Sequence, residues 1–354
     1  MDDRSTLQER WGDPMNADGH VRLRLQAGIE PRPMKAPLHI TGYTFTDLEA
    51  LVVQLHEGDR TGRGEAQGVY YRNDTPASML AQVEALRDRI EAGLTREQLL
   101  HLLPPGGARN ALDCALWDLE AKRTGQPVWK LAGLREPRPL LTTFTLGADD
   151  PEIMAQGARS YTGARALKLK LTDDSLNAER VRAVRAARPD AWIMADANQG
   201  FTRETFSELL PALVEARISL VEQPFPVGCE AWLDGLDSPI RLAADESVQD
   251  HNDLQKLAGR VSVINIKLDK CGGLTEALAM AGEARKLGFG LMVGNMSGSS
   301  LAMAPSFVVG QLCEVVDLDG AFFLRGDVSP GATYENGSIW CADSVWGGAS
   351  NPRP

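Results

Sequence analysis

The chain has few of the features on which several classes of protein depend. Its five cysteines are spread over 354 residues without a Cys-x-x-Cys pair, so neither a disulfide framework nor a thiolate metal site is expected. No apolar run reaches the roughly 18 residues of a membrane-spanning helix. No run of lysines or arginines interrupts a net charge of −11, which argues against a nucleic-acid partner.

The N-terminal segment carries no targeting pattern. Residues 1–20 are polar and acidic and lack the apolar region of a secretory signal. We therefore expect a loose tail and a cytoplasmic protein. A homo-oligomer is compatible with the sequence, because symmetric assemblies are common among soluble proteins.

The pattern of apolar residues changes near residue 130. Residues 21–57 alternate apolar and polar residues as strands do, whereas 76–92 and 109–124 carry apolar residues at helical spacing. From Leu140 onward, short apolar runs alternate with helical segments. The runs are LLTTFTL, ALKLKL, WIMAD, ISLVE, IRLAAD, VSVINIKL, FGLMVG and CEVVDL. Eight strands separated by helices predict a (β/α)8 barrel.

These patterns predict an α/β fold with three parts. We expect an α+β domain over 1–130 and the barrel over 131–321. Residues 322–354 lack the strand–helix alternation, and we expect them to pack back on the first domain.

Charged residues follow the barrel strands at regular intervals. Lys170, Asp196, Glu222, Asp245 and Lys270 lie 23 to 26 residues apart, each at or just after the end of an apolar run. Since the carboxyl ends of barrel strands form one bowl, these side chains are expected to meet in a single site. The three acids end consecutive strands and offer hard oxygen donors, so the sequence predicts a Mg²⁺ site. The alternative for any one acid is a helix cap or a loop charge.

Lysines flank this expected metal site. Lys168 and Lys170 are two residues apart on the second strand and therefore face the same side of it. On the sixth strand, Lys267 falls within the apolar run, whereas Lys270 follows it and is the better candidate for the bowl. Lysines on opposite faces of a carbon could remove and return a proton and so invert its configuration. The same groups can serve an elimination or a cycloisomerisation.

Two further acids follow the eighth strand. Asp317 and Asp319 share a face and lie too far round the barrel to join the metal ligands. We expect them to bind a cationic group of a substrate, of which an ammonium is the simplest. An acidic turn before Gly320 is the structural alternative.

Six separated motifs carry a resemblance to a known family. KLK, DANQ, VEQP, ADES, INIKLDKCGG and DLDG resemble, in order and spacing, the muconate-cycloisomerase-like subgroup of the enolase superfamily. Within it, DLDG is similar to the dipeptide epimerases, including the L-Ala-D/L-Glu epimerases. GRGEA and ARNALDCALWDLEAKRTGQPVWKLAG are similar to the superfamily's capping domain and its junction with the barrel. The resemblance covers roughly residues 21 to 325.

The resemblance implies a reaction and a role for each matching residue. It implies epimerisation of the C-terminal residue of a dipeptide through an enediolate, with one Mg²⁺ per subunit held by the three carboxylates. Lys170 and Lys270 are the implied acid/base catalysts, Lys168 contacts the substrate carboxylate, and Asn198 lies behind the ligands. The implied substrate-binding residues also include Asp317, Asp319, Thr145 and Asn295.

One segment departs from the family pattern. Relatives that act on Ala-Glu have a basic residue in the loop between the first strands, whereas residues 40–46 here, ITGYTFT, have none and offer Tyr43 and Phe45. We therefore predict that the second residue of the dipeptide is not acidic and is hydrophobic. Arg22 and Arg24, upstream in the expected strand, would restore an acidic preference if they reached this position.

Rival functions stay open on the sequence alone. o-Succinylbenzoate synthase and muconate cycloisomerase substrates carry no ammonium, which leaves Asp317 and Asp319 without a role. A barrel lyase forming a Schiff base on Lys170 or Lys270 leaves the three carboxylates without one. A catalytically inactive binding module would not need the complete set of motifs.

Overall fold

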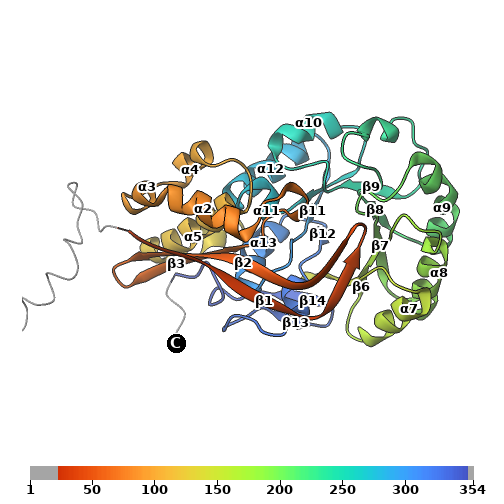
Figure 1. The fold of residues 1–354 in the computed structure, drawn as a ribbon, viewed down its shortest axis with the longest axis horizontal. Coiled ribbons are helices and arrows are strands. Elements are labelled where there is room, and N and C mark those ends of the chain that lie inside the picture. The colour runs from red at the N-terminus through yellow and green to blue at the C-terminus, as the bar shows by residue number, and fades with distance from the viewer. Residues whose placement is uncertain (1–22, 350–354) are drawn as a thin grey trace, which may run out of the picture.

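A computed structural model describes residues 23–349, which contain three β-sheets. The expected tail, residues 1–20, and Arg22 lie outside these residues. In Figure 1, an antiparallel sheet with its helices lies at one end and a barrel surrounded by helices at the other. In the described part of the chain, no helix combines the length and the apolar character needed to cross a membrane.

Three antiparallel strands and a group of helices form the N-terminal part. Leu51 and Val53 of the central strand belong to the core that the sheet shares with the helices. Thr75 and Thr95 each begin a helix with a capping box, and Gly125, at φ +66°, ends the longest one. The elements are β1 (Arg24–Ile40), β2 (Tyr43–Glu57), β3 (Arg60–Ala66), η1 (Tyr70–Arg72), α2 (Pro76–Ala85), α3 (Arg87–Glu91), α4 (Arg96–Leu102), α5 (Gly107–Thr124) and α6 (Val128–Leu131).

Strands β1 and β2 form a long hairpin that reaches over the barrel (Figure 1). Gly42 has a φ of +74° in its tight turn, a conformation that glycine adopts without strain. The hydroxyl of Thr41 lies 3.0 Å from the carbonyl oxygen of Leu171 and 2.9 Å from that of Ala197. These contacts fasten the turn to the carboxyl ends of two barrel strands.

Eight parallel strands form the barrel sheet and are hydrogen bonded in chain order. They are β5 (Thr143–Leu146), β6 (Ala166–Lys170), β7 (Trp192–Asp196), β8 (Leu220–Glu222), β9 (Arg241–Ala244), β10 (Val263–Ile266), β11 (Gly290–Val293) and β12 (Val315–Val316). The connecting helices are α7 (Pro151–Ser160), α8 (Asn177–Ala187), α9 (Arg203–Glu215), η2 (Glu230–Leu233), η3 (His251–Asp253), α10 (Leu254–Leu257), α11 (Leu268–Cys271), α12 (Leu274–Lys286) and α13 (Ser300–Gly310). The predicted eight-stranded barrel is confirmed.

Side chains bridge the first and last barrel strands. The hydroxyl of Thr143 donates to Asp317 Oδ1 over 2.6 Å, and the amide of Thr145 donates to Asp319 Oδ2 over 2.7 Å. The amide of Leu318 donates in turn to the Thr142 hydroxyl over 2.9 Å. We call these three contacts the barrel seam. They join β5 to the segment after β12, where the backbone ladder of the sheet has its two ends.

Two predicted elements are divided in the structure. The strand predicted over LLTTFTL splits because Leu140 and Leu141, as β4, pair with a C-terminal strand rather than with the barrel. The helix predicted over 76–92 is interrupted at Leu86, whose φ of −101° and ψ of 4° are not helical. The helix predicted over 109–124 is confirmed as part of α5.

The C-terminal segment contacts the N-terminal part at several points. Trp346 Nε1 donates to the Arg63 carbonyl over 2.8 Å, and the Gly347 amide donates to Asp118 Oδ1 over 2.9 Å. Its regular elements are η4 (Gly320–Phe323), β13 (Thr333–Glu335) and β14 (Ser338–Trp340). The domain boundaries at 130 and 321 stay predictions, although these contacts agree with a segment that returns to the first domain.

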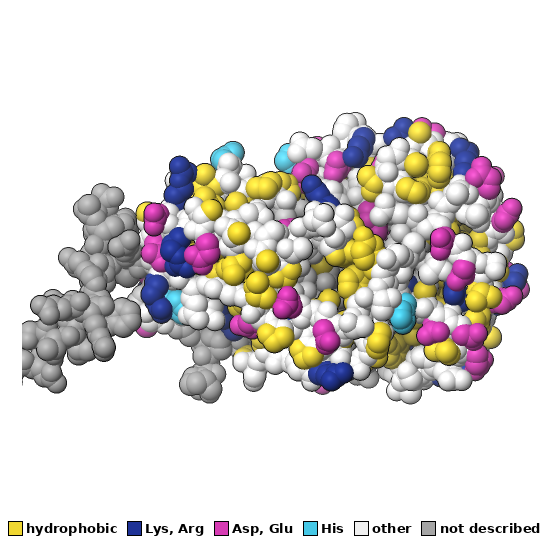
Figure 2. Space-filling view, viewed as in Figure 1, with side chains coloured by type: hydrophobic (Ala, Val, Ile, Leu, Met, Phe, Trp, Pro, Cys, Tyr) yellow, Lys and Arg dark blue, Asp and Glu magenta, His cyan; other side chains and the backbone are white. Residues whose placement is uncertain are grey.

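The surface carries both signs of charge. Lysines and arginines are interspersed with aspartates and glutamates on the face shown in Figure 2. Several of these charges are paired, as in the contact of 2.7 Å between Arg123 and Glu57. Such exposed pairs contribute little to stability.

Candidate active site

The interior of the barrel has two layers that follow from the period of two along each strand. An apolar cluster fills its lower part and consists of Met194, Leu220, Ala243, Val263, Met292 and Val315. Two residues after five of these positions come Asp196, Glu222, Asp245, Asn265 and Asp317. Because alternate residues of a strand face the same side, these polar groups form a second layer above the apolar one.

Lys168 and Lys170 enter this polar layer from β6. Lys170 Nζ lies 2.6 Å from Asp196 Oδ2 and 2.9 Å from Asn198 Oδ1. Lys168 Nζ lies 3.0 Å from Asp196 Oδ2, 2.8 Å from Glu222 Oε2 and 2.8 Å from Asp317 Oδ2. The strand brings both predicted lysines together with two of the predicted metal ligands.

The pKa values in this layer follow from the competition between burial and paired charge. Burial favours a neutral acid, yet Lys170 and Lys168 lower the pKa of Asp196 to about 2. Burial and the charge of Asp196 raise the pKa of Glu222 to about 7. Burial opposes the charge of Lys168, but Asp317 and Glu222 outweigh it and hold the pKa of Lys168 well above its usual value.

On the opposite side of the barrel, two lysines meet Asp245. Lys267 Nζ lies 2.7 Å from Asp245 Oδ2, and 7% of the residue is exposed. Lys270 Nζ lies 2.5 Å from Asp245 Oδ1, 2.6 Å from the Asp245 carbonyl and 3.0 Å from the Asn265 carbonyl, and the residue is 1% exposed. Burial lowers the pKa of Lys270, whereas Asp245 overcomes burial and raises that of Lys267.

These contacts distinguish the two lysines. Lys267 follows Val263 and Asn265 at the period of two and therefore continues the inward-facing series of β10. Lys270 belongs to α11, and three oxygen atoms already surround its amine. The expectation that Lys270 is the better candidate for the bowl is not supported by this geometry.

Asp317 and Asp319 are both buried. Asp317 accepts from Lys168 and Thr143, and Lys168 outweighs burial to lower its pKa. Burial and the neighbouring charge of Asp317 raise the pKa of Asp319 to about 7. Thr145 binds Asp319 through its backbone, while Asn295 Nδ2 donates to the Asp317 carbonyl over 2.7 Å. The two carboxylates predicted to bind a substrate ammonium therefore also make the hydrogen bonds of the barrel seam.

The predicted metal ligands share a layer, with lysine ammonium groups among them. Within residues 23–349, no group of three or more His, Cys, Asp or Glu side chains is arranged to hold a metal ion. The donor chemistry still fits Mg²⁺, because Asp196, Glu222 and Asp245 are buried carboxylates. Glu222 Oε2 makes no hydrogen bond, since its 2.8 Å approach to Lys168 is an ion pair without hydrogen-bond alignment. Metal ligation by this set stays a prediction.

Aromatic rings from the N-terminal part gather at this end of the barrel. The ring centroids of Tyr43 and Tyr70 lie 4.5 Å apart, and those of Phe45 and Tyr70 lie 5.1 Å apart. Tyr71 packs on Tyr70 at 5.1 Å. We call these four residues the aromatic cluster. Gln249 Nε2 donates to the Tyr71 hydroxyl over 3.1 Å and to the Glu246 carbonyl over 2.8 Å, which places the cluster beside the loop that follows β9.

Several residues of the site are not predicted from the sequence. Tyr70 and Tyr71 follow β3 without a strand-end pattern, and nothing in the sequence marks them. Glu246 has a buried Oε2 without a hydrogen-bond partner, and burial with Asp245 raises its pKa to about 8. Asn265 donates to Glu222 Oε1 over 2.6 Å. The period of two along VINIK could have identified both Asn265 and Lys267.

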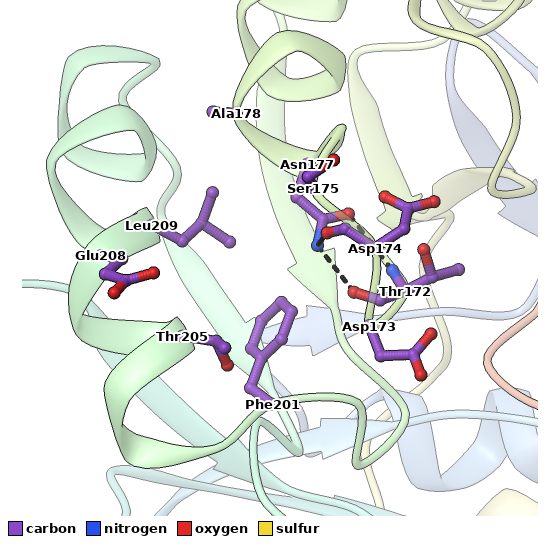
Figure 3. A pocket seen from close by; sticks show the side chains of 10 residues that line it. All are labelled: Thr172, Asp173, Asp174, Ser175, Asn177, Ala178, Phe201, Thr205, Glu208 and Leu209. Atoms are coloured by element: carbon purple, nitrogen blue, oxygen red, sulfur yellow. Dashed lines mark hydrogen bonds between the residues drawn. The ribbon is translucent and has the colours of Figure 1, made fainter.

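A separate hollow lies elsewhere on the barrel. It encloses about 340 Å³ between the loop after β6 and helices α8 and α9 (Figure 3). Phe201 and Leu209 supply its apolar wall, and Asp173, Asp174 and Glu208 lie at its margin. None of the predicted site residues lines it, so it is separate from the polar layer.

Two family models match consecutive parts of the chain. Residues 26–133 match the mandelate racemase / muconate lactonizing enzyme N-terminal domain, and residues 152–342 match the enolase C-terminal domain-like family. The chain belongs to the enolase superfamily. The α+β part that matches the N-terminal domain of the family is called the capping domain below, and the resemblance drawn from the six motifs is confirmed.

Individual relatives are similar over nearly their whole length. The L-Ala-D/L-Glu epimerase of Escherichia coli is 38% identical over 312 residues, which cover 88% of this chain and 97% of the relative. A structure from Agrobacterium tumefaciens, described as an enolase family member with homology to dipeptide epimerases and bound to sodium and L-Ala-L-Glu, is 41% identical with a TM-score of 0.89, covering 92% of this chain and all of its own. A dipeptide epimerase of Methylococcus capsulatus, complexed with Mg and L-Arg-D-Lys, is 31% identical with a TM-score of 0.84, covering 90% and 97%.

Proposed function

We propose that the protein is a Mg²⁺-dependent dipeptide epimerase that inverts the α-carbon of the C-terminal residue. The observation that carries this proposal is the placement of Lys170 on β6 and Lys267 after β10, with β7, β8 and β9 and their three carboxylates between them. In an eight-stranded barrel these two strands stand on opposite sides. The epimerase relatives support the same reaction class.

The chain's lysines supply the proton transfers. One lysine takes the α-proton from one face, and the electrons of the broken C–H bond move into the substrate carboxylate to give an enediolate. The other lysine returns a proton to the opposite face, so the new C–H bond has inverted configuration. Lys168, deep in the same layer, would lie against the substrate carboxylate. One lysine begins neutral and ends protonated, and the other begins protonated and ends neutral, so the number of protons on the pair is unchanged.

We assign the second base to Lys267 rather than to Lys270. Lys267 extends the inward-facing series of β10, and a single carboxylate oxygen holds its amine. Three oxygen atoms surround the amine of Lys270, two of them backbone carbonyls. An amine so enclosed is suited to anchoring Asp245 and not to reaching a substrate carbon.

The three carboxylates are the proposed ligands of Mg²⁺. Asp196, Glu222 and Asp245 would hold one ion per subunit, as the buried oxygen donors and the unbonded Oε2 of Glu222 allow. When bound, the ion would stabilise negative charge on the substrate carboxylate. It would also weaken the ion pairs between the three carboxylates and the lysines. Chelation should abolish turnover, and added Mg²⁺ should restore it.

Asp317 and Asp319 are the proposed site for the α-ammonium of the dipeptide. Two buried acids side by side are costly, and an added cation relieves that repulsion. This contact distinguishes the proposal from an o-succinylbenzoate synthase or a muconate cycloisomerase, whose substrates carry no ammonium. Thr145 and Asn295 support the two acids through backbone contacts.

The aromatic cluster is the proposed contact for the side chain of the second residue. The hairpin turn carries no lysine or arginine, and the Thr41 contacts bring Tyr43 and Phe45 to the barrel mouth. Arg24 pairs with His56 at the far end of the hairpin and cannot supply a cation there. We therefore propose an uncharged, hydrophobic second residue.

One observation favours an acidic second residue instead. Arg72 follows Tyr71 in η1, is exposed, and donates to Gln249 over 3.2 Å. Its remaining guanidinium donors could meet a carboxylate near the aromatic cluster. The relatives named for L-Ala-D/L-Glu activity give this alternative weight.

A dipeptide panel in D₂O tests the function and the selectivity together. Each L-Ala-L-Y dipeptide that is a substrate should gain one deuterium as its second residue inverts, which mass spectrometry and chiral analysis detect. Preference for Y = Phe, Leu or Tyr supports the hydrophobic assignment. Preference for Y = Glu, lost in Arg72→Ala, replaces it with the acidic one. No deuterium incorporation into any dipeptide with Mg²⁺ present would refute the epimerase proposal.

A further inference from the structure

Helix α11 joins the capping domain to the polar layer of the barrel. It is one turn long, follows β10 directly, and all four of its residues are buried. On one side Lys270 reaches Asp245, and on the other Asp269 and the carbonyl of Cys271 face the capping domain. The residue immediately before the helix is Lys267, the proposed base.

Asp269 binds the backbone of a capping-domain loop. Its Oδ1 accepts the amide of Gln67 over 2.9 Å and the amide of Gly68 over 2.8 Å. The residue is 6% exposed, so these contacts are shielded from water. The loop begins immediately after β3 and leads into η1.

This loop is closely confined along its length. Gly68 has a φ of +77°, and a Cβ there would come within 2.0 Å of the Asp74 carbonyl oxygen. The amide of Asp74 donates back to the Val69 carbonyl over 3.3 Å, and its carboxylate accepts the Gly107 amide over 2.7 Å. A loop held at both ends transmits the position of its first residues to those that follow.

The residues that follow are Tyr70 and Tyr71 of the aromatic cluster. Tyr70 contacts both rings of the hairpin, and Tyr71 Oη accepts from Gln249 Nε2 over 3.1 Å. The rings thus stand between the hairpin and the loop after β9. Two amide contacts with Asp269 connect them to the helix that follows Lys267.

We propose that Asp269 is a positioning residue that sets the aromatic cluster in register with the base at the end of β10. It touches neither the substrate nor the reacting atoms, and it acts through the backbone of Gln67 and Gly68. The proposal rests on the proposed function, because the cluster is assigned there to the second residue of the dipeptide. Loss of Asp269 should weaken selection of that residue more than it slows proton transfer.

Asp113 provides a matched control. It too is a buried acid at the junction of the capping domain and the barrel, where it accepts from the Thr275 amide over 2.9 Å and from the Thr275 hydroxyl over 2.6 Å. Its contacts lead to the start of α12 and not to the aromatic cluster. Asp113→Ala therefore removes a comparable contact without touching the Gln67–Gly68 loop.

The experiment compares Asp269→Ala, Asp269→Asn and Asp113→Ala in the full chain with Mg²⁺. For the preferred dipeptide, Asp269→Ala should raise KM about tenfold while kcat changes less than about threefold, the pattern expected for lost ground-state binding. Its preference for that dipeptide over L-Ala-L-Ala should fall by a similar factor. Asp269→Asn keeps an oxygen acceptor and should retain both values, and Asp113→Ala should retain the preference while losing stability.

A second readout does not depend on catalysis. Amide hydrogen exchange over residues 66–72 should accelerate in Asp269→Ala and stay slow in the other two variants. If the wild type acts on no dipeptide, the proposed function fails and this readout still decides the positioning role of Asp269. An unchanged preference in Asp269→Ala, or an equal loss in Asp113→Ala, overturns the proposal. If Asp269→Ala does not fold, Asp269→Glu, which displaces the carboxylate by one methylene, should show the same loss of preference.

Discussion

The two lysine pairs of the site contrast in how the backbone presents them. Lys168 and Lys170 lie two residues apart within β6, and both reach the polar layer, where they share Asp196. Lys267 and Lys270 lie three residues apart across the junction of β10 and α11, and they meet Asp245 from two directions. Both lysines of the first pair lie in one strand. In the second pair, the strand ends and a helix begins between the two lysines.

This difference teaches that spacing determines orientation only inside one element. A period of two places both β6 lysines on the inner face. After β10 the chain continues as a helix. Lys270 contacts Asp245 from that helix, and its amine also contacts two backbone carbonyls. We expect the members of the first pair to act together near the substrate and those of the second to have separate duties.

The largest expected effect separates the opposed lysines. Lys170→Ala and Lys267→Ala should each lower epimerisation by about 10²- to 10⁴-fold, the range of general acid–base contributions. Each should still exchange the α-proton of one enantiomer with D₂O, and the two should prefer opposite enantiomers. Exchange of both enantiomers by Lys267→Ala would break the contrast, because the second base would then lie elsewhere.

Lys270→Met should have a different signature. Removing one partner of a buried ion pair costs on the order of 3 kcal/mol, so the free energy of unfolding in urea should fall markedly. Both enantiomers should still exchange their α-proton, with reduced Mg²⁺ affinity because Asp245 loses an anchor. A stable variant that exchanges a single enantiomer would instead restore Lys270 as the base.

Asp319, which belongs to neither lysine pair, should make both stability and KM depend moderately on pH. Its folded pKa of about 7 lies above the usual value, so the protonated form stabilises the fold, and this stabilisation is lost as pH rises from about 4 through 7. Ionised Asp319 attracts an ammonium, so KM should fall severalfold between pH 6 and 7.5 while stability decreases. Asp319→Asn should remove both trends, and their persistence would assign them to another group.

The smallest expected effect concerns the hairpin turn. Thr41→Val removes a hydroxyl that contacts the Leu171 and Ala197 carbonyls, at a cost of about 1 kcal/mol. Selectivity for the second residue should weaken, while α-proton exchange on each face stays within about twofold of wild type. A large loss of exchange would show that the hairpin also positions the lysines.

The sequence predicts more of the fold than of the site. Apolar runs and helical spacing identify the barrel because strands buried on both faces are continuously apolar. The inward direction of Asp196, Glu222 and Asp245 follows from the barrel and the pleat. Lys267 lay within reach of the same reasoning, since it continues the alternation of Val263 and Asn265.

Other features depend on contacts between distant segments. The loop before Tyr70 donates two amide hydrogen bonds to Asp269, about 200 residues later in the chain. The split of LLTTFTL depends on β14, which offers Leu140 and Leu141 a partner outside the barrel. The spacing of residues along the chain predicts neither contact, because each joins segments about 200 residues apart.

The barrel seam constrains how this protein can diversify. Asp317 and Asp319 hold the first strand to the last and are also the proposed site for the amino end of the dipeptide. A mutation there that admits a new amino-terminal group also loosens the closure of the barrel, so folding filters it before any gain in activity matters. The hairpin turn does not combine the two roles in one residue. Thr41 fastens it to the barrel, so Tyr43, which is 44% exposed, is free to change. New substrate preferences should therefore arise first in the second residue of the dipeptide and only later at the amino end.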